Sequence, residues 1–276
     1  MKSITLILVL FLQSFAIAAI EKSDLIKAFD LIYAQRTDEF KLEKSTEFKG
    51  LLKDYLNEND PFTADLDGLK LFSKGEKKGK FRIFNWNVPL NEKHHFECFF
   101  AVANKKTGFT FLDCTPSKKP NSKIKNRTMS HKDWPSALYY EIVPLQKNSN
   151  YFVLLGWDGY DELINRKVIE IIYVSERTIK FGANKFKEYP KPIKRYILEY
   201  GDDAIVSINY DVKFKRFVFD HLSPTRPDLE GQYQFYVPDM TFDAFVLKKG
   251  DLYFRENIKF LREKQESDKE FYDPRN

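Results

Sequence analysis

The residues best suited to chemistry lie in residues 216–245, which read RFVFDHLSPTRPDLEGQYQFYVPDMTFDAF. The stretch is a polar loop between two aromatic, strand-like runs. Two carboxylates that converge in a cleft are the minimum requirement for glycoside hydrolysis, and a histidine can exchange protons near neutral pH. The catalytic candidates are therefore one histidine and four carboxylates: Asp220, His221, Asp228, Glu230 and Asp239.

Strand geometry limits what these candidates can do together. Neighbouring residues of a strand point to opposite faces, so Asp220 and His221 do not form an acid–base pair with each other. Asp228 and Glu230 share a face only if the chain is extended after Pro227. The sequence therefore gives no complete catalytic pair in this stretch.

The same stretch has a structural interpretation, in which a proline-bounded loop uses its acids to cap turns or to pair with Arg226 or Lys215. No nucleophile elbow, phosphate loop, dinucleotide fingerprint or metalloprotease helix occurs in the sequence. We therefore expect a non-catalytic protein, with a carboxylate hydrolase as the alternative.

A second candidate site is the segment GWDGYDE at residues 156–162. Trp157 and Tyr160 have aromatic faces that can stack on a sugar, and Asp158 adds a carboxylate, so these three residues are the binding candidates. Clustered carboxylates also suit calcium, but the spacing is not that of an EF-hand loop. Because Asp and Gly are ordinary residues of tight turns, we expect a turn here and a tryptophan that belongs to the core.

Two neighbouring histidines, His94 and His95, invite comparison with a metal site. They point to opposite faces of an extended chain and cannot easily chelate one ion together. Neither makes a zinc motif with Cys98, because no second ligand pair has matching spacing. We expect no bound metal and no cofactor.

The two cysteines of the chain flank the turn-forming sequence NKKTG. A hairpin centred on Lys106 places Cys98 directly opposite Cys114. Opposed residues bring their Cβ atoms to within about 4.5 to 5.5 Å, which a disulfide can bridge with modest adjustment. An exported location permits such a bond to persist. We expect a disulfide, with two free, packed thiols as the alternative.

Residues 19–60 form a helical segment in which apolar residues recur at spacings of three and four. The pattern predicts two amphipathic helices, over residues 25–33 and 48–56, with Ser23 and Ser45 as N-caps. Each helix has one apolar stripe, so both are expected to pack on the remainder of the chain.

From residue 80 to 262 the sequence changes to short extended runs separated by turn residues. In the first run, Phe81 and Ile83 share one face, and Phe84 and Trp86 share the other. Strands are predicted over residues 81–88, 96–103, 109–114, 137–143, 151–157, 167–174, 178–181, 195–200, 205–210, 215–221, 232–236, 242–247 and 252–255.

These runs indicate a mainly β, α+β fold: an antiparallel β-sandwich or a strongly curved sheet with two N-terminal helices. No repeat is clean enough to predict a propeller. A charged tail follows at residues 263–276.

The N-terminus, residues 1–18, has the pattern of a secretory signal peptide. Lys2 precedes an apolar run from Ile4 to Leu12, and small residues follow at Ala16 and Ala18. The apolar run is too short to span a bilayer. The pattern therefore predicts export to the periplasm or cell surface, with no transmembrane segment in the mature chain.

The charge balance argues against a nucleic-acid-binding protein. The chain has 45 basic and 40 acidic side chains and a net charge of +5, and the two signs occur together along most of the sequence. We therefore expect no nucleic-acid partner, while the oligomeric state is not predictable from these residues.

Three segments carry a resemblance to a protein family: FRIFNWN at residues 81–87, YFVLLGW at 151–157, and FDHLSP with LEGQYQFYVPD at 219–239. Over most of residues 81–261 the chain resembles uncharacterised exported β-rich proteins of Bacteroidota. The resemblance implies export and no particular activity. We predict an exported, non-catalytic β domain that binds an envelope protein or a saccharide.

Overall fold

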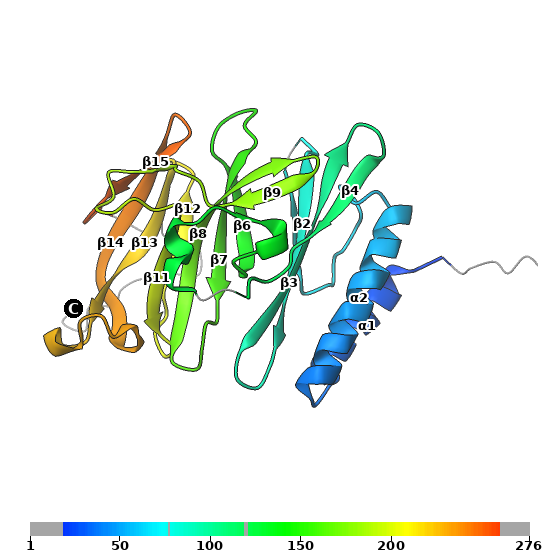
Figure 1. Cartoon of the computed structure of the whole chain (residues 1–276), viewed down its shortest axis with the longest axis horizontal. Helices are drawn as coiled ribbons and strands as arrows, with labels where there is room; N and C mark the ends of the chain where they lie inside the picture. The colour runs from blue at the N-terminus through cyan, green and yellow to red at the C-terminus, as the bar shows by residue number, and fades with distance from the viewer. Residues whose placement is uncertain (1–18, 77, 119–120, 260–276) are drawn as a thin grey trace, which may run out of the picture.

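The computed structural model describes residues 19–76, 78–118 and 121–259. Two helices and three β-sheets are stacked along the long axis of the molecule (Figure 1). The expected mainly β, α+β fold with two N-terminal helices is confirmed. The predicted signal peptide, residues 1–18, and the predicted charged tail, residues 263–276, lie outside the described residues.

The helices are α1 (Lys22–Ala34) and α2 (Asp38–Glu58). The first sheet contains four strands: β1 (Phe72–Gly75), β2 (Phe81–Pro89), β3 (His94–Asn104) and β4 (Gly108–Asp113). The second sheet contains six strands: β5 (Met129–Ser130), β6 (Leu138–Pro144), β7 (Tyr151–Asp158), β8 (Ile164–Ser175), β9 (Thr178–Phe181) and β11 (Arg195–Gly201).

The third sheet contains five strands: β10 (Phe186–Lys187), β12 (Ile208–Asp211), β13 (Arg216–Pro224), β14 (Tyr236–Lys248) and β15 (Asp251–Arg255). Short 3-10 helices lie in the connections: η1 (Asn121–Asn126), η2 (His131–Asp133), η3 (Pro227–Leu229) and η4 (Tyr233–Phe235).

Alternation along the strands explains why the sheets stack. In β2, Phe81 and Ile83 enter a core shared with the second sheet, and Phe84 and Trp86 enter a core shared with the helices. The second sheet likewise sends alternate residues of β7 into cores with the first and the third sheets. Because both faces of these two sheets are apolar, each is covered on both sides.

Each sheet is built around one meander of two long strands and a shorter one: β2–β3–β4, β7–β8–β9 and β13–β14–β15. The connection between the long strands is short in the first two meanders, residues 90–93 and 159–163, and long in the third, residues 225–235. Antiparallel pairing places these connections at one end of the stack and the tighter turns at the other, as Figure 1 shows.

The helix starts differ from the predicted ones. Thr37 caps α2 by accepting a hydrogen bond from the backbone N–H of Phe40, and Glu21 caps α1. The predictions of Ser23 and Ser45 as N-caps were wrong, because each helix begins earlier in the chain. Ser45 lies inside α2, where its buried hydroxyl accepts a hydrogen bond from Trp86 Nε1 at 2.9 Å.

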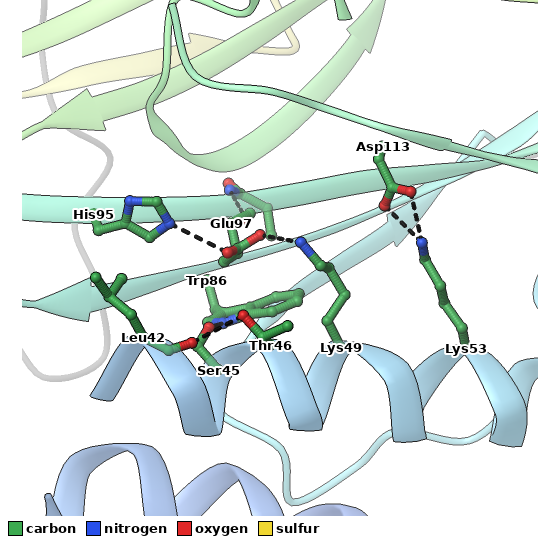
Figure 2. Close-up of polar contacts among 10 residues, drawn as sticks. Leu42, Ser45, Thr46, Lys49, Lys53, Trp86, His95, Glu97 and Asp113 are labelled. Carbon is green, nitrogen blue, oxygen red and sulfur yellow. Dashed lines mark hydrogen bonds and ion pairs between the residues drawn. The ribbon is translucent and has the colours of Figure 1, made fainter. Parts of the chain in front are cut away.

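Ion pairs and hydrogen bonds join α2 to the first sheet (Figure 2). Lys49 donates to Glu97 at 2.7 Å, and His95 contacts the same carboxylate at 3.2 Å. Burial alone raises the pKa of Glu97, but His95 and Lys49 together hold it below its ordinary value. Further along the helix, Lys53 pairs with Asp113 at 2.6 Å. The helical segment is therefore part of the stacked structure, as expected.

One predicted strand was wrong, that over residues 232–236. Gly231 has a positive φ of +82°, and its backbone N–H donates to the hydroxyl of Tyr236 at 3.0 Å. This turn forces residues 233–235 into η4, so extended structure resumes only at Tyr236. In the described part of the chain no helix has both the length and the apolar character needed to cross a bilayer.

Candidate functional site

A cleft of about 290 Å³ opens where β11 of the second sheet meets β13 and β14 of the third. Its aromatic lining consists of Tyr189, Tyr196, Tyr233, Tyr236 and Phe254. Its charged and titratable lining consists of Lys125, Glu199, Asp220, His221, Asp243 and Glu256. Three sheet strands and η4 thus bring polar groups and tyrosine rings into one concave surface.

The imidazole of His221 is oriented by Asp243 within this cleft. Its Nδ1 lies 2.8 Å from Asp243 Oδ2, while the other carboxylate oxygen accepts the backbone N–H of Asn257 at 3.0 Å. Asp243 pairs directly with Phe219 in the β13–β14 ladder and is only 4% exposed. The buried carboxylate of Asp243 is therefore bonded to the half-exposed imidazole of His221.

The charge of His221 follows from these neighbours. The hydrogen bond to Asp243 raises the pKa of His221, and the nearby carboxylate of Asp239, 3.9 Å from Nε2, adds to the rise. Since both neighbours favour the protonated ring, His221 acts as a cationic hydrogen-bond donor over a wider pH range than a free histidine.

Two further catalytic candidates lie beside His221, but their oxygens already accept hydrogen bonds. Asp220 accepts the backbone N–H and the hydroxyl of Ser207, at 2.6 and 3.0 Å. Asp239 accepts the hydroxyls of Ser223 and Thr241, at 2.9 and 2.7 Å. Burial opposes the change, but these hydrogen bonds hold the pKa of Asp239 below its ordinary value. Both carboxylates therefore stabilise turns and strand ends.

The remaining two candidates lie away from the cleft. Asp228 is exposed in η3 and pairs with Arg226 at 3.0 Å, and Glu230 is exposed at the end of the same turn. The chain is not extended after Pro227, so the condition under which both acids would share a face is not met. The five candidates thus divide into three near the cleft and two in solvent.

Tyrosine rings supply the aromatic surface of the cleft. The rings of Tyr233 and Tyr236 lie 5.1 Å apart, and those of Tyr189 and Tyr196 lie 5.6 Å apart, between ring centroids. Tyr233 is 38% exposed, with the ammonium group of Lys125 lying 5.9 Å from its ring centroid. An exposed ring beside a cation and carboxylates combines apolar and polar recognition.

The floor of the cleft contains an ion-pair chain. Glu199 of β11 accepts hydrogen bonds from Lys125 at 2.9 Å and from Arg166 at 2.7 Å. Burial opposes the effect, but these two cations hold the pKa of Glu199 below its ordinary value. Glu199 therefore stays ionised and fixes Lys125 next to Tyr233.

In the second predicted site, residues 156–162, the two aromatic rings pack against other side chains of the protein. Trp157 packs edge-on against His94 at 4.8 Å and donates to Asn165 at 3.2 Å. Tyr160 has one face covered by the guanidinium of Arg166, 3.3 Å from the ring centroid. Burial raises the pKa of Asp158 to about 6, although Arg166 opposes the rise.

The turn of this second site is shaped by one carboxylate. Asp161 accepts the backbone N–H groups of Leu163 and Ile164, at 2.9 and 2.8 Å, as in an ordinary Asx turn. Within the residues that the structure describes, no group of three His, Cys, Asp or Glu side chains is placed to hold a metal ion. The segment thus has the turn geometry that was expected.

The histidine and cysteine geometry agrees with the strand arguments. His94 contacts Trp157 on the side of the second sheet, and His95 contacts Glu97 on the side of the helices. Cys114 donates its backbone N–H to the carbonyl of Cys98 at 2.9 Å, so the two cysteines face each other. Both are buried free thiols in this structure, and the disulfide stays a prediction.

Sequence reasoning missed Asp243, the residue that orients His221. The signal was present in the run TFDAFVL at residues 241–247, where alternation gives Asp243 the same face as Phe245. A carboxylate on an apolar, inward-facing strand surface needs a partner. The roles of Lys125, Glu199 and Tyr189 had no comparable signal, because these residues come from segments that are distant in the sequence from residues 216–245.

Comparison of the chain with protein-family models, curated proteins and solved structures finds no match. The case for a function therefore depends on the geometry of the cleft.

Proposed function

We propose that the protein is an exported, non-catalytic binding module whose cleft holds a saccharide. The observation that carries the proposal is the exposed ring of Tyr233 beside Lys125 and His221 in one concave surface. Sugars present apolar C–H faces that stack on aromatic rings, and hydroxyl groups that hydrogen-bond to charged side chains. The volume of about 290 Å³ fits a short segment of a glycan.

The roles of individual residues follow from their chemistry. Tyr233 and Tyr236 offer ring faces for stacking, while protonated His221 and Lys125 donate hydrogen bonds to sugar oxygens. Glu256, which also lines the cleft, offers carboxylate acceptors for sugar hydroxyls. These groups are supported by the buried Asp243 and the part-buried Glu199, so little ordering is needed on binding.

The alternative function, a hydrolase of an envelope or imported polymer, has one observation in its favour. His221 backed by buried Asp243 resembles the base and orienting acid of a nucleophilic site. However, none of the described residues lining the cleft is Ser, Cys or Thr. A base without a nucleophile beside it does not complete that mechanism.

A carboxylate mechanism is also poorly supported. A glycosidase needs a protonated general acid with a raised pKa next to a second carboxylate. Among the described carboxyl groups, those with a raised pKa are Asp158 and Glu170. Both line a different, very small void under η1. Binding without bond cleavage is therefore the function we propose.

The binding test uses a glycan microarray probed with the chain from Ala19 onward, which contains every residue of the three cores. Positive glycans are then titrated by calorimetry. Tyr233→Ala is expected to weaken binding at least about fivefold, because the stacking of a nucleic-acid base on one aromatic ring contributes about 1 to 3 kcal/mol and a sugar face stacks on the same kind of surface. Tyr160→Ala, which removes an equally exposed ring from the second predicted site, is the matched control.

Three results would contradict the proposal. These are the absence of any bound glycan, an equal loss in both tyrosine variants, or release of new reducing ends from a bound glycan. Recovery of one envelope protein in place of a glycan, with Tyr233 at its interface, would support the binding module and identify its other predicted ligand class.

Export is a separate part of the proposal and depends on the pattern of residues 1–18. Expression of the full chain in a Gram-negative host, followed by mass spectrometry of the protein from the periplasmic fraction, tests it. A mature N-terminus at Ala19 or Ile20 supports export, and an intact Met1 in the cytoplasmic fraction contradicts it.

A further inference from the structure

The opposite end of the molecule from the cleft carries a groove of about 800 Å³. It lies where the edge strands β1, β6 and β12 of the three sheets come together, and the β6–β7 and β14–β15 turns that border it stand at the upper end of Figure 1. Its apolar lining includes Ile142, Val143, Leu145, Phe152, Val212 and Leu247.

The charged rim of this groove is strongly biased toward cations. Five lysines and two glutamates line it: Lys74, Lys78, Lys147, Lys215 and Lys249, with Glu76 and Glu141. Lys74 is paired with Glu141. Within the part of the chain that the structure describes, Lys147, Lys215 and Lys249 make no ion pair, so their charges face solvent and raise the local positive potential.

Two apolar side chains project from the β12–β13 turn at the edge of the groove. Val212 is 74% exposed and Phe214 is 58% exposed. The turn alternates them with cations in the sequence DVKFKR at residues 211–216, and the guanidinium of Arg216 lies 4.6 Å from the Phe214 ring centroid. Burial within the protein therefore does not account for these two side chains.

We propose that this end of the molecule docks on an anionic lipid bilayer. Val212 and Phe214 enter the boundary between head groups and acyl chains, and Lys147, Lys215 and Lys249 contact the lipid phosphates. Exposed apolar side chains among cations are the composition of surfaces that bind at a membrane interface. Exposed apolar side chains mark contacts with proteins or with membranes, and the lysines around Val212 and Phe214 suit the phosphates of an anionic membrane surface.

Docking through this groove defines the orientation of the protein on the membrane. The groove lies at the end with the tight turns, and the tyrosine cleft lies at the end with η3 and η4. Docking through the groove therefore leaves the cleft open on the side away from the lipid. The proposed membrane-binding surface consists of residues outside the cleft, so it does not depend on what the cleft binds.

The test is flotation of the chain from Ala19 onward with vesicles. One set contains phosphatidylcholine alone, and the other contains phosphatidylcholine and phosphatidylglycerol in equal parts. Binding is expected to the second set only, and to weaken at about 1 M salt, where the screening length falls to about 3 Å. Starting the chain at Ala19 removes the apolar run of residues 4–12 as a competing membrane anchor.

Two double variants separate charge from insertion. Lys215→Ala with Lys249→Ala is expected to lower the partition coefficient about 25-fold, at about fivefold per lysine. Val212→Ser with Phe214→Ser is expected to lower it at least about tenfold, because buried apolar area is lost. All four positions are exposed, and a thermal unfolding scan checks that each variant is folded.

The matched controls lie at the other end of the sheets. Lys93→Ala with Arg226→Ala removes two charges from the connections there, and Ile205→Ser removes an apolar side chain that is 93% exposed. Both controls are expected to bind like the unmodified chain. Equal losses in the controls, no binding to phosphatidylglycerol vesicles, or binding that survives Val212→Ser with Phe214→Ser would each overturn the proposal.

Discussion

The Nδ1 atom of His221 lies 2.8 Å from Asp243 Oδ2 across the β13–β14 hairpin, with the carboxylate buried and the imidazole half-exposed. The pair is possible because the ladder register shifts between Asp220 and Leu222, which leaves His221 at a β-bulge. Bulges commonly redirect a side chain at the edge of a functional surface. The most distinctive loop of the sequence is therefore anchored by a residue in the strand that follows it.

Asp243→Asn is predicted to return the pKa of His221 toward its ordinary value. The hydrogen bond to Asp243 is the main cause of the raised pKa in the folded protein. The unfolded value is about 6.5, so the stabilisation from the pair is fully present below about pH 6.5 and is lost as pH rises through the folded pKa. The measurement is an NMR titration of the imidazole signals of both proteins.

His131 is the internal control in the same titration. Burial lowers its pKa, and it lies against β9, remote from the substitution. Its curve is expected to be unchanged. An unaltered His221 curve in Asp243→Asn would show that the carboxylate does not set the charge of the ring.

Ser45→Ala is predicted to destabilise the fold by about 1 to 3 kcal/mol, because it leaves the buried Trp86 Nε1–H without its acceptor. Urea unfolding measures the change. Thr46→Ala is the matched control, since Thr46 is exposed and its hydroxyl donates to the carbonyl of Leu42 in its own helix. If both variants were equally stable, the hydrogen bond from Trp86 to Ser45 in Figure 2 would have no structural role.

Most of the strands were predictable from the sequence, because their patterns are local. In β2, for example, the alternation of Phe81 and Ile83 with Phe84 and Trp86 gives the two faces that the structure shows. The hairpin with Cys98 opposite Cys114 was predictable for the same reason, since turn residues fix its register.

The layer order and the composition of the cleft were not predictable in the same way. Nothing local shows that both faces of β7 are covered by other sheets, or that Lys125 meets Glu199 across the sequence. The predicted start of α2 was wrong because Ser45, a residue type that often caps helices, serves here as the hydrogen-bond acceptor for Trp86. Long-range contacts override propensity at such positions.

A disulfide between Cys98 and Cys114 is predicted for protein isolated from an oxidising compartment. The backbone hydrogen bond from Cys114 to Cys98 holds the strands in register, and both side chains are buried. A short loop of this kind adds up to about 3 kcal/mol to the free energy of unfolding. Thiol labelling of unfolded, non-reduced protein is expected to find no reactive thiol.

The control for this bond is the variant Cys98→Ala with Cys114→Ala, whose unfolding midpoint should not change when a reductant is added. Two labelled thiols in the unmodified, non-reduced protein would end the disulfide prediction. The alternative, a pair of packed apolar thiols, would then stand.

Glu170→Leu and Arg195→Met are each predicted to destabilise the fold by about 3 to 5 kcal/mol, because each leaves one buried partner uncompensated. Their side chains are 0% and 1% exposed and lie 2.6 Å apart between Glu170 Oε2 and Arg195 Nε. Burial raises the pKa of Glu170 although Arg195 opposes the rise.

A third variant distinguishes the buried charge from the packing around it. Among the described residues, Glu170 Oε1 and Arg195 Nη2 have no hydrogen-bond partner, so the pair is incompletely satisfied. Glu170→Leu combined with Arg195→Met removes both charges at similar volume and is expected to be more stable than either single variant. Urea unfolding of all four proteins measures the coupling, and additive losses would show that the two residues act independently.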